Sequence, residues 1–131
     1  MWLAEHDLKP GCASVPGAFC DGRFNLTLEG RKVAGTAQRW RRSRDGRPVV
    51  LAHAAVLIDD WREHMAEVVN RFYHACASDL RCGADRHLAL AERLRAAWSE
   101  AEQLPEHYRR VLGWHGLEIG ARAASPPRVL P

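Results

Sequence analysis

A lysine between two glycines is the residue of this sequence best suited to chemistry. Lys32 lies in the stretch GRKVAGTAQR, with Gly30 before it and Gly35 after it, and Lys9 is the only other lysine. An ammonium group in a mostly apolar slot stabilises a carboxylate, an acyl phosphate or a developing oxyanion. Gly35 would let a ligand approach the backbone closely. From the spacing alone, the alternative is a lysine that faces solvent after a turn.

The segment around this lysine is predicted to form a strand. Simple alternation would place Lys32, Ala34, Thr36 and Gln38 on one face of that strand. The small side chains beside the lysine would leave room for a thin aliphatic chain. If a ligand binds here, the site is expected to be narrow, with one cation at its head.

The longer stretch from Pro16 to Ile58 resembles the lipoate–protein ligase and octanoyltransferase family, which shares its fold with biotin–protein ligases. The matching elements are an FCDG loop, an N-L-x-L strand, the GRKVAGTAQR hairpin and an HAAVLID strand. The resemblance implies that Lys32 reaches the carboxyl end of an acyl chain or of its activated form. It also implies that the chain corresponds to the C-terminal half of the family's catalytic domain.

The resemblance adds Cys20 as a second catalytic candidate. In some transferases of the family, the cysteine of an F-C-x-G loop ahead of the hairpin lysine forms an acyl thioester, and Cys20 stands in that place. A cation such as Lys32 would lower the pKa of this thiol and so activate it as a nucleophile. The alternative is a small loop thiol that only packs. Ligase members, which use an adenylate, do not need it.

Five further residues are predicted to contact substrate: Gly35, Thr36, Gln38, His53 and Asn25. His53 could touch the acyl group or its acceptor, and a hydrogen-bonded core histidine is the alternative. Asn25 is expected to shape the FCDG loop and the first strand. No metal ligand is predicted. The pattern formed by His74, Cys76, Cys82 and His87 fits no standard zinc site, and Cys76 falls on an apolar helical stripe.

The resemblance implies an enzyme that attaches an acyl group to the lysine of an acceptor domain. Lipoate or octanoate would be the acyl substrate, and a lipoyl domain or an acyl-carrier protein would be the partner. The family's upstream R-R-x-[ST]-G-G-G element does not occur in this sequence. ATP and Mg²⁺ are therefore expected only if a second chain or an upstream segment supplies that half. The second hypothesis is a non-catalytic half-domain that binds an acyl chain or a partner polypeptide at an exposed sheet edge.

A basic cluster is the last chemical feature, and its members are Arg39, Arg41, Arg42, Arg44 and Arg47. With Trp40 it could grip phosphates and stack a base. It lacks the aromatic spacing of an RNA-binding module, so no nucleic-acid partner is predicted. It could instead meet the acidic surface of a lipoyl domain or carrier protein.

Composition indicates one globular domain. The chain has 131 residues and a net charge of +3. Its longest apolar run, 49–58, is too short to span a bilayer, and its first residues do not form a signal peptide. The protein is therefore expected to be cytoplasmic, with no membrane partner and with its four cysteines reduced.

The expected fold is α+β, with a small, mostly antiparallel sheet of about three strands covered by two or three helices. The chain is treated as one partial domain: a leading loop over 1–22, strands within 24–58, helices within 59–113 and a tail over 114–131. Because residues 48–58 are apolar on both faces, they are expected to form a strand in the middle of a covered sheet. A helix capped by Asp59 or Asp60 is expected to end at Gly83, and further helices are expected over 85–103 and from Pro105 to Gly113.

Overall fold

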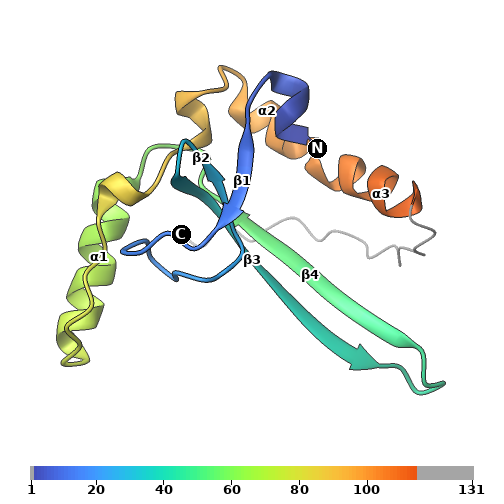
Figure 1. The fold of residues 1–131 in the computed structure, drawn as a ribbon, viewed down its shortest axis with the longest axis horizontal. Coiled ribbons are helices and arrows are strands. Elements are labelled where there is room, and N and C mark those ends of the chain that lie inside the picture. The colour runs from blue at the N-terminus through green and yellow to red at the C-terminus, as the bar shows by residue number, and fades with distance from the viewer. Residues whose placement is uncertain (1, 115–131) are drawn as a thin grey trace, which may run out of the picture.

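The computed structural model describes residues 2–114 (Figure 1). Its antiparallel sheet has the order β1-β2-β3-β4, formed by β1 (Pro10–Ala13), β2 (Asn25–Leu28), β3 (Arg31–Arg42) and β4 (Pro48–Val56). The helices are α1 (Arg62–Ala75), α2 (Ala97–Glu102) and α3 (Leu104–Trp114), with 3₁₀ turns at Trp2–His6, Ala84–Arg86 and Leu90–Glu92. The predicted α+β fold is confirmed, and the leading loop contributes a fourth strand. Nearly all of the predicted tail lies outside the described residues.

A two-residue turn joins β2 to β3. Leu28 pairs with Arg31, and the two residues between them, Glu29 and Gly30, both have left-handed backbones, with φ of 54° and 73°. Such a turn matches the twist of the strands that it connects. Two short bonds of 2.6 Å from Arg93 hold the Glu29 carboxylate and, with Arg31, lower its pKa to about 2. The turn is thereby tied to Arg93, which follows the 3₁₀ turn Leu90–Glu92.

A β-bulge interrupts the pairing of β2 with β3. Leu26 lies opposite Ala34, whereas the next residue, Thr27, lies opposite Lys32. Val33 is therefore the extra residue of β3. Because Leu26 and Thr27 point to opposite faces of the sheet, Ala34 and Lys32 do so as well.

The bulge corrects the expectation from simple alternation. Beyond it, Gly35 lies on the same face as Lys32, and a Cβ atom added to Gly35 would lie 3.5 Å from the lysine Nζ. Thr36 and Gln38 lie on the opposite face with Ala34. The face that carries Lys32 therefore continues outward along the odd-numbered residues of β3.

The hydrophobic core lies at one end of the molecule, where the first 3₁₀ turn, the bases of the strands and residues 88–97 meet. Its members are Trp2, Leu3, Leu28, Val33, Leu88, Leu90, Leu94 and Ala97. The predicted helix over 85–103 is wrong in its first half. Three consecutive residues, 88–90, are fully buried, which one face of a helix cannot achieve.

His87 and Ala89 instead have extended backbones, the 3₁₀ turn Leu90–Glu92 follows, and this stretch bonds to residues of the sheet and just after it. The Leu88 N–H donates to the Lys32 carbonyl at 2.9 Å, and the Leu90 N–H donates to the Leu57 carbonyl at 2.8 Å. These bonds place His87 beside the start of β3, where it forms a parallel bridge with Lys32.

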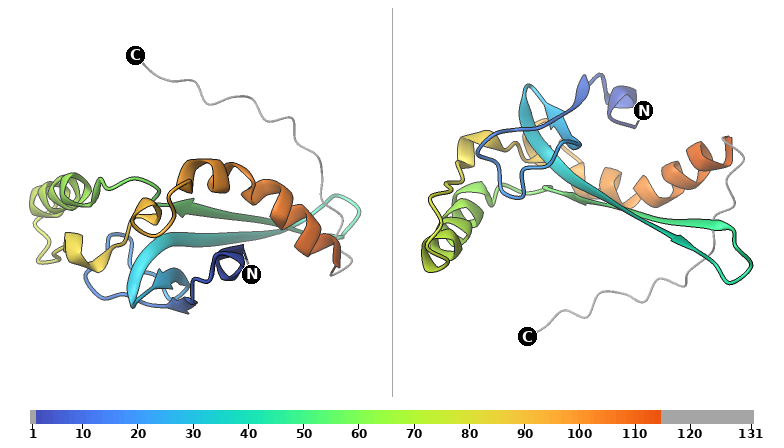
Figure 2. Two further views of the ribbon diagram at one scale, coloured as in Figure 1. Left: turned by 90° about the horizontal axis from the view of Figure 1, so that it is seen from above. Right: turned by 60° about the horizontal axis from the view of Figure 1, so that its bottom comes forward.

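The outer part of the β3–β4 hairpin extends away from this core (Figures 1 and 2). All residues over 36–42 and 48–55 are exposed. The prediction that 48–58 forms a central, covered strand is therefore wrong, because β4 is an edge strand. Among residues 2–114, no helix is long and apolar enough to cross a membrane.

Helix α1 also leaves its apolar stripe open. Trp61, Met65, Val68 and Phe72 recur at helical spacing, yet all four are exposed. The helix begins at Arg62 without a side-chain cap, and Trp61 occupies the N-cap position in place of the predicted aspartate. The spacing in the sequence therefore identifies the apolar face of α1 correctly. Within residues 2–114, however, most of that face does not pack against another segment.

Candidate functional site

A pocket of about 310 Å³ opens between the base of the hairpin, the start of α1 and the loop before β2. Its lining is Phe19, Lys32, Val33, Ala34, Gly35, Ala55, Val56, Leu57, Trp61, Met65 and His87. Lys32 and His87 are the only residues of this lining whose side chains can carry a charge. The volume is near the lower end of the range for small-ligand sites, roughly 300–1,000 Å³.

The Lys32 ammonium lies at the inner side of the pocket and away from bulk water. The residue is 3% exposed, and its Nζ donates to the carbonyls of Phe19 at 2.6 Å and Cys20 at 2.9 Å. Burial lowers the pKa of Lys32 below its ordinary value of 10.5, and the electrostatic influence of the neighbouring acidic groups, Asp21 among them, opposes that shift. An ammonium has three N–H donors, so one remains for a ligand.

The Cys20 thiol is exposed at the loop that the lysine holds. Cys20 has φ of 49°, a left-handed backbone that brings two successive carbonyls to one cation. Its carbonyl accepts from the Lys32 Nζ at 2.9 Å, so the two residues lie side by side. Cys82, by contrast, is buried, and burial raises the pKa of its thiol. Cys20 is therefore the accessible sulfur of this site, although it does not line the pocket itself.

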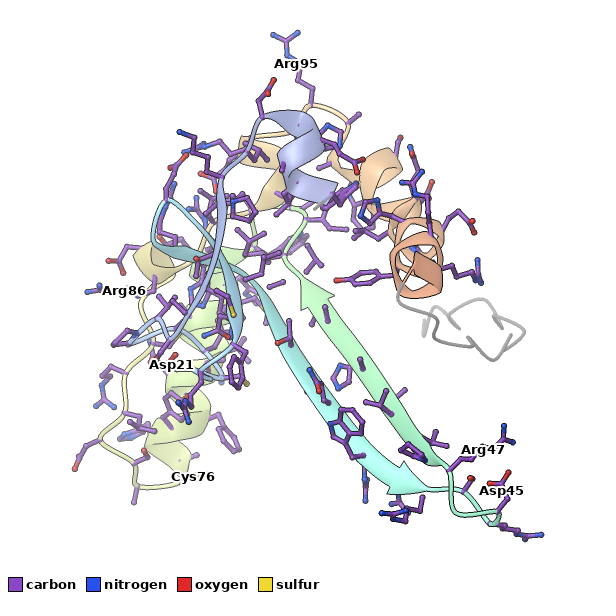
Figure 3. The ribbon with its side chains drawn as sticks, turned by 45° about the vertical axis from the view of Figure 1, so that its right-hand side comes forward. Asp21, Asp45, Arg47, Cys76, Arg86 and Arg95 are labelled. Carbon is purple, nitrogen blue, oxygen red and sulfur yellow. The ribbon has the colours of Figure 1, made fainter. Side chains whose placement is uncertain are left out.

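Two polar side chains fix the shape of the loop around Cys20. The Asp21 carboxylate accepts from the Val15 N–H at 2.9 Å and from the Ser14 hydroxyl at 3.0 Å (Asp21 is labelled in Figure 3). The buried Asn25 amide donates to the Gly22 carbonyl at 2.7 Å. Asn25 thus organises the loop and does not line the pocket.

His87 is a site residue that the sequence analysis missed. It is 1% exposed, its ring stacks on that of Phe19 with centroids 3.8 Å apart, and its Nε2 accepts from the Phe19 N–H at 3.1 Å. Its Nδ1 lies 3.0 Å from the Gly83 carbonyl, which can only accept. The ring is therefore neutral with its proton on Nδ1, and burial lowers its pKa below 6.5.

The only sequence signal for His87 was its place in the discounted zinc pattern. Among residues 2–114, no group of three or more His, Cys, Asp or Glu side chains could hold a metal ion. The histidine instead braces Phe19 from one side while Lys32 holds its carbonyl from another. The pair fixes the backbone that leads to Cys20.

The remaining predicted contacts are divided between the two faces of the hairpin. Gly35 lines the pocket, and His53 lies further out on the same face, opposite Ala37, where it is exposed. On the other face, the Thr36 hydroxyl donates to the Phe24 carbonyl at 2.6 Å, and the Gln38 amide oxygen accepts from the indole of Trp40. The structure thus brings together Lys32, Cys20 and Gly35, but not Thr36 or Gln38.

Comparison with known proteins relates this chain to octanoyltransferases over about half its length. It is 42% identical over 77 residues to an octanoyl-[GcvH]:protein N-octanoyltransferase of Kyrpidia tusciae, covering 54% of this chain and 26% of the relative. A protein of the same name from Bacillus velezensis is 32% identical over 77 residues, covering 59% of this chain and 25% of the relative.

An uncharacterised protein of Cupriavidus necator is 38% identical over 95 residues, covering 64% of this chain and 38% of the relative. No family model matches the chain. The chain spans between about a quarter and two fifths of the length of these curated relatives. The relationship to octanoyl transfer therefore rests on part of each relative.

Proposed function

We propose that this chain takes part in the transfer of an octanoyl or lipoyl group to a lysine of an acceptor protein. Cys20 would carry the acyl group as a thioester, and Lys32 would hold the loop and contact the acyl oxygen. The observation that carries the proposal is a buried ammonium that binds the backbone of an exposed cysteine beside an apolar pocket. The names of the two octanoyltransferase relatives support the same chemistry.

The proposed reaction has two balanced steps. The Cys20 thiolate attacks the acyl carbonyl, so a carbon–sulfur bond forms while the bond to the donor breaks and the donor leaves with a proton. The acceptor amine then attacks the thioester, which forms an amide and returns the thiol. The remaining N–H donor of Lys32 would stabilise the oxyanion in both steps. The apolar walls formed by Ala55, Met65 and their neighbours would take the aliphatic chain.

The experiment uses the three exposed cysteines as a matched set. The protein is incubated with octanoylated GcvH or an octanoyl thioester and its intact mass is measured. An added octanoyl group is expected in the wild type, in Cys12→Ser and in Cys76→Ser, but not in Cys20→Ser. An adduct that persists in Cys20→Ser, or that all three substitutions reduce equally, would contradict the role of Cys20.

A second candidate is a non-catalytic acyl-binding half-domain. It is favoured by the hydrogen bonds of Lys32, since two of its three donors already serve the protein backbone. That function predicts saturable binding of octanoate, weakened by substitution of Lys32, with no covalent adduct under any condition. The mass measurement above separates the two functions.

A further inference from the structure

The outer hairpin carries positive charge that the described part of the chain does not neutralise. Its arginines are Arg39, Arg41, Arg42, Arg44 and Arg47, and its one acidic residue is Asp45. Asp45 pairs with Arg47 at 2.7 Å, at the tip of the hairpin (Figure 3), and Arg42 donates to the Gly46 carbonyl. Within residues 2–114, Arg39, Arg41 and Arg44 have no acidic partner.

The register of the sheet divides these charges between two faces. Since the bulge places Lys32 and Gly35 on one face, Arg39 and Arg41 follow on that same face. Arg42 lies on the opposite face. From Gly35 to Arg41 the strand covers about 20 Å at roughly 3.3 Å per residue. A row of exposed positive charge thus leads outward from the mouth of the pocket.

Aliphatic side chains of the neighbouring strand β4 lie beside this row of arginines. Leu51 pairs with Arg39, and Val49 pairs with Arg41. Trp40, the only Trp, Tyr or Phe residue of the outer hairpin, lies on the other face. The imidazole of His53, paired with Ala37, is the only ring that the outer hairpin brings to this face, so it lacks the successive rings of a base-stacking surface. Arginine is enriched at protein–protein interfaces relative to the rest of the surface.

We propose that Arg39 and Arg41 form a docking surface for an acidic protein surface, which presents the acyl group or the receiving lysine to the pocket. This inference rests on the proposed function and names the partner of the same site. Complementary charge would steer the partner's approach, and because both arginines are exposed, salt would screen the attraction over about 10 Å at 0.1 M.

Two neighbouring arginines provide a matched test. Arg41→Glu and Arg42→Glu change the charge equally, on the same strand, but on opposite faces. The kcat/KM for transfer from octanoylated GcvH of net negative charge is measured against that for a neutral octanoyl-N-acetylcysteamine thioester. We expect Arg41→Glu to lower the value for the protein donor at least about tenfold at low salt. Arg42→Glu should change it by no more than about twofold.

Raising the salt concentration should remove the difference, and neither substitution should affect the small donor. Equal effects of the two substitutions, or a loss with the small donor, would overturn the proposal. Binding of the same GcvH, measured by calorimetry, tests docking even where no transfer is seen, so failure of the chemistry can be told from failure of the surface. Tighter binding to a duplex RNA, lost in Arg41→Glu, would also overturn it.

Discussion

Lys32 performs a structural task before it can act on any ligand. Its ammonium holds the loop that carries Cys20 in place. The carbonyls of Phe19 and Cys20, on either side of the Cys20 Cα, both accept hydrogen bonds from the Lys32 Nζ. The left-handed backbone at Cys20 costs roughly 1–3 kcal/mol for a residue other than glycine, and charge-assisted bonds of this kind offset such a cost.

Replacing Lys32 with methionine should therefore destabilise the fold as well as the site. The apolar stem would still fill its place, but two carbonyls would lose their donor, at a cost of about 1–3 kcal/mol in the free energy of unfolding. Urea titration followed by circular dichroism measures this change. Lys9→Met, at an exposed position, is the control and should change little. Wild-type stability in Lys32→Met would show that the lysine does not brace the loop.

The lowered pKa of the buried His87 predicts that the fold becomes less stable on acidification. Its folded pKa lies below the ordinary 6.5, so around that pH the unfolded chain binds more protons than the folded one. The contribution of neutral His87 to the free energy of unfolding is complete above pH 6.5. It is lost as the pH falls through the lower pKa that His87 has in the folded protein. Protonation would also place a second donor against the Phe19 N–H.

The thermal midpoint should accordingly fall on acidification below pH 6.5, and more steeply in the wild type than in His87→Gln. Glutamine can still accept the Phe19 N–H bond but does not titrate. His74→Gln, on the exposed side of α1, should keep the wild-type slope. Identical slopes in all three proteins would contradict the assignment of His87 as the neutral brace.

At the scale of elements, the bulge in β3 decides which residues share the pocket face. A methyl group at Gly35 would make an ordinary van der Waals contact with Lys32, 3.5 Å from its Nζ, so Gly35→Ala should keep ligand binding. Gly35→Leu should fill the pocket and abolish saturable octanoate binding, measured by calorimetry. Ala37→Leu, further out on the same face, should bind like the wild type. Binding that survives in Gly35→Leu would place the ligand elsewhere.

Local patterns predicted the hairpin, since its turn residues and its alternation are properties of neighbouring positions. They could not predict the bulge, because one extra residue leaves no mark on composition. Nor could they predict that residues 88–90 are not helical, because their N–H groups bond to carbonyls of Lys32 and Leu57 that only the folded chain brings near. His87 was missed for the same reason, since its partner Phe19 is 68 residues away.

At the scale of the whole molecule, apolar patterning and burial disagree over 48–55 and along α1. The apolar pattern of the sequence shows which faces favour burial. It does not show whether another segment within residues 2–114 packs against them. The relatives extend well beyond the matched region, and the basic row of the hairpin is also exposed. The exposed basic row is the surface on which the proposed acidic partner would dock.

Because burial is uneven along the chain, truncating Leu90 and truncating Leu51 should have very different effects on stability. Leu90 is fully buried in the core, so Leu90→Ala should cost about 2–5 kcal/mol in the free energy of unfolding. Leu51 is 63% exposed on β4, and Leu51→Ala should stay within about 0.5 kcal/mol of the wild type. Urea midpoints at two protein concentrations measure both effects. A large cost for Leu51→Ala that grows with protein concentration would mean that copies of this chain cover the hairpin of one another in solution.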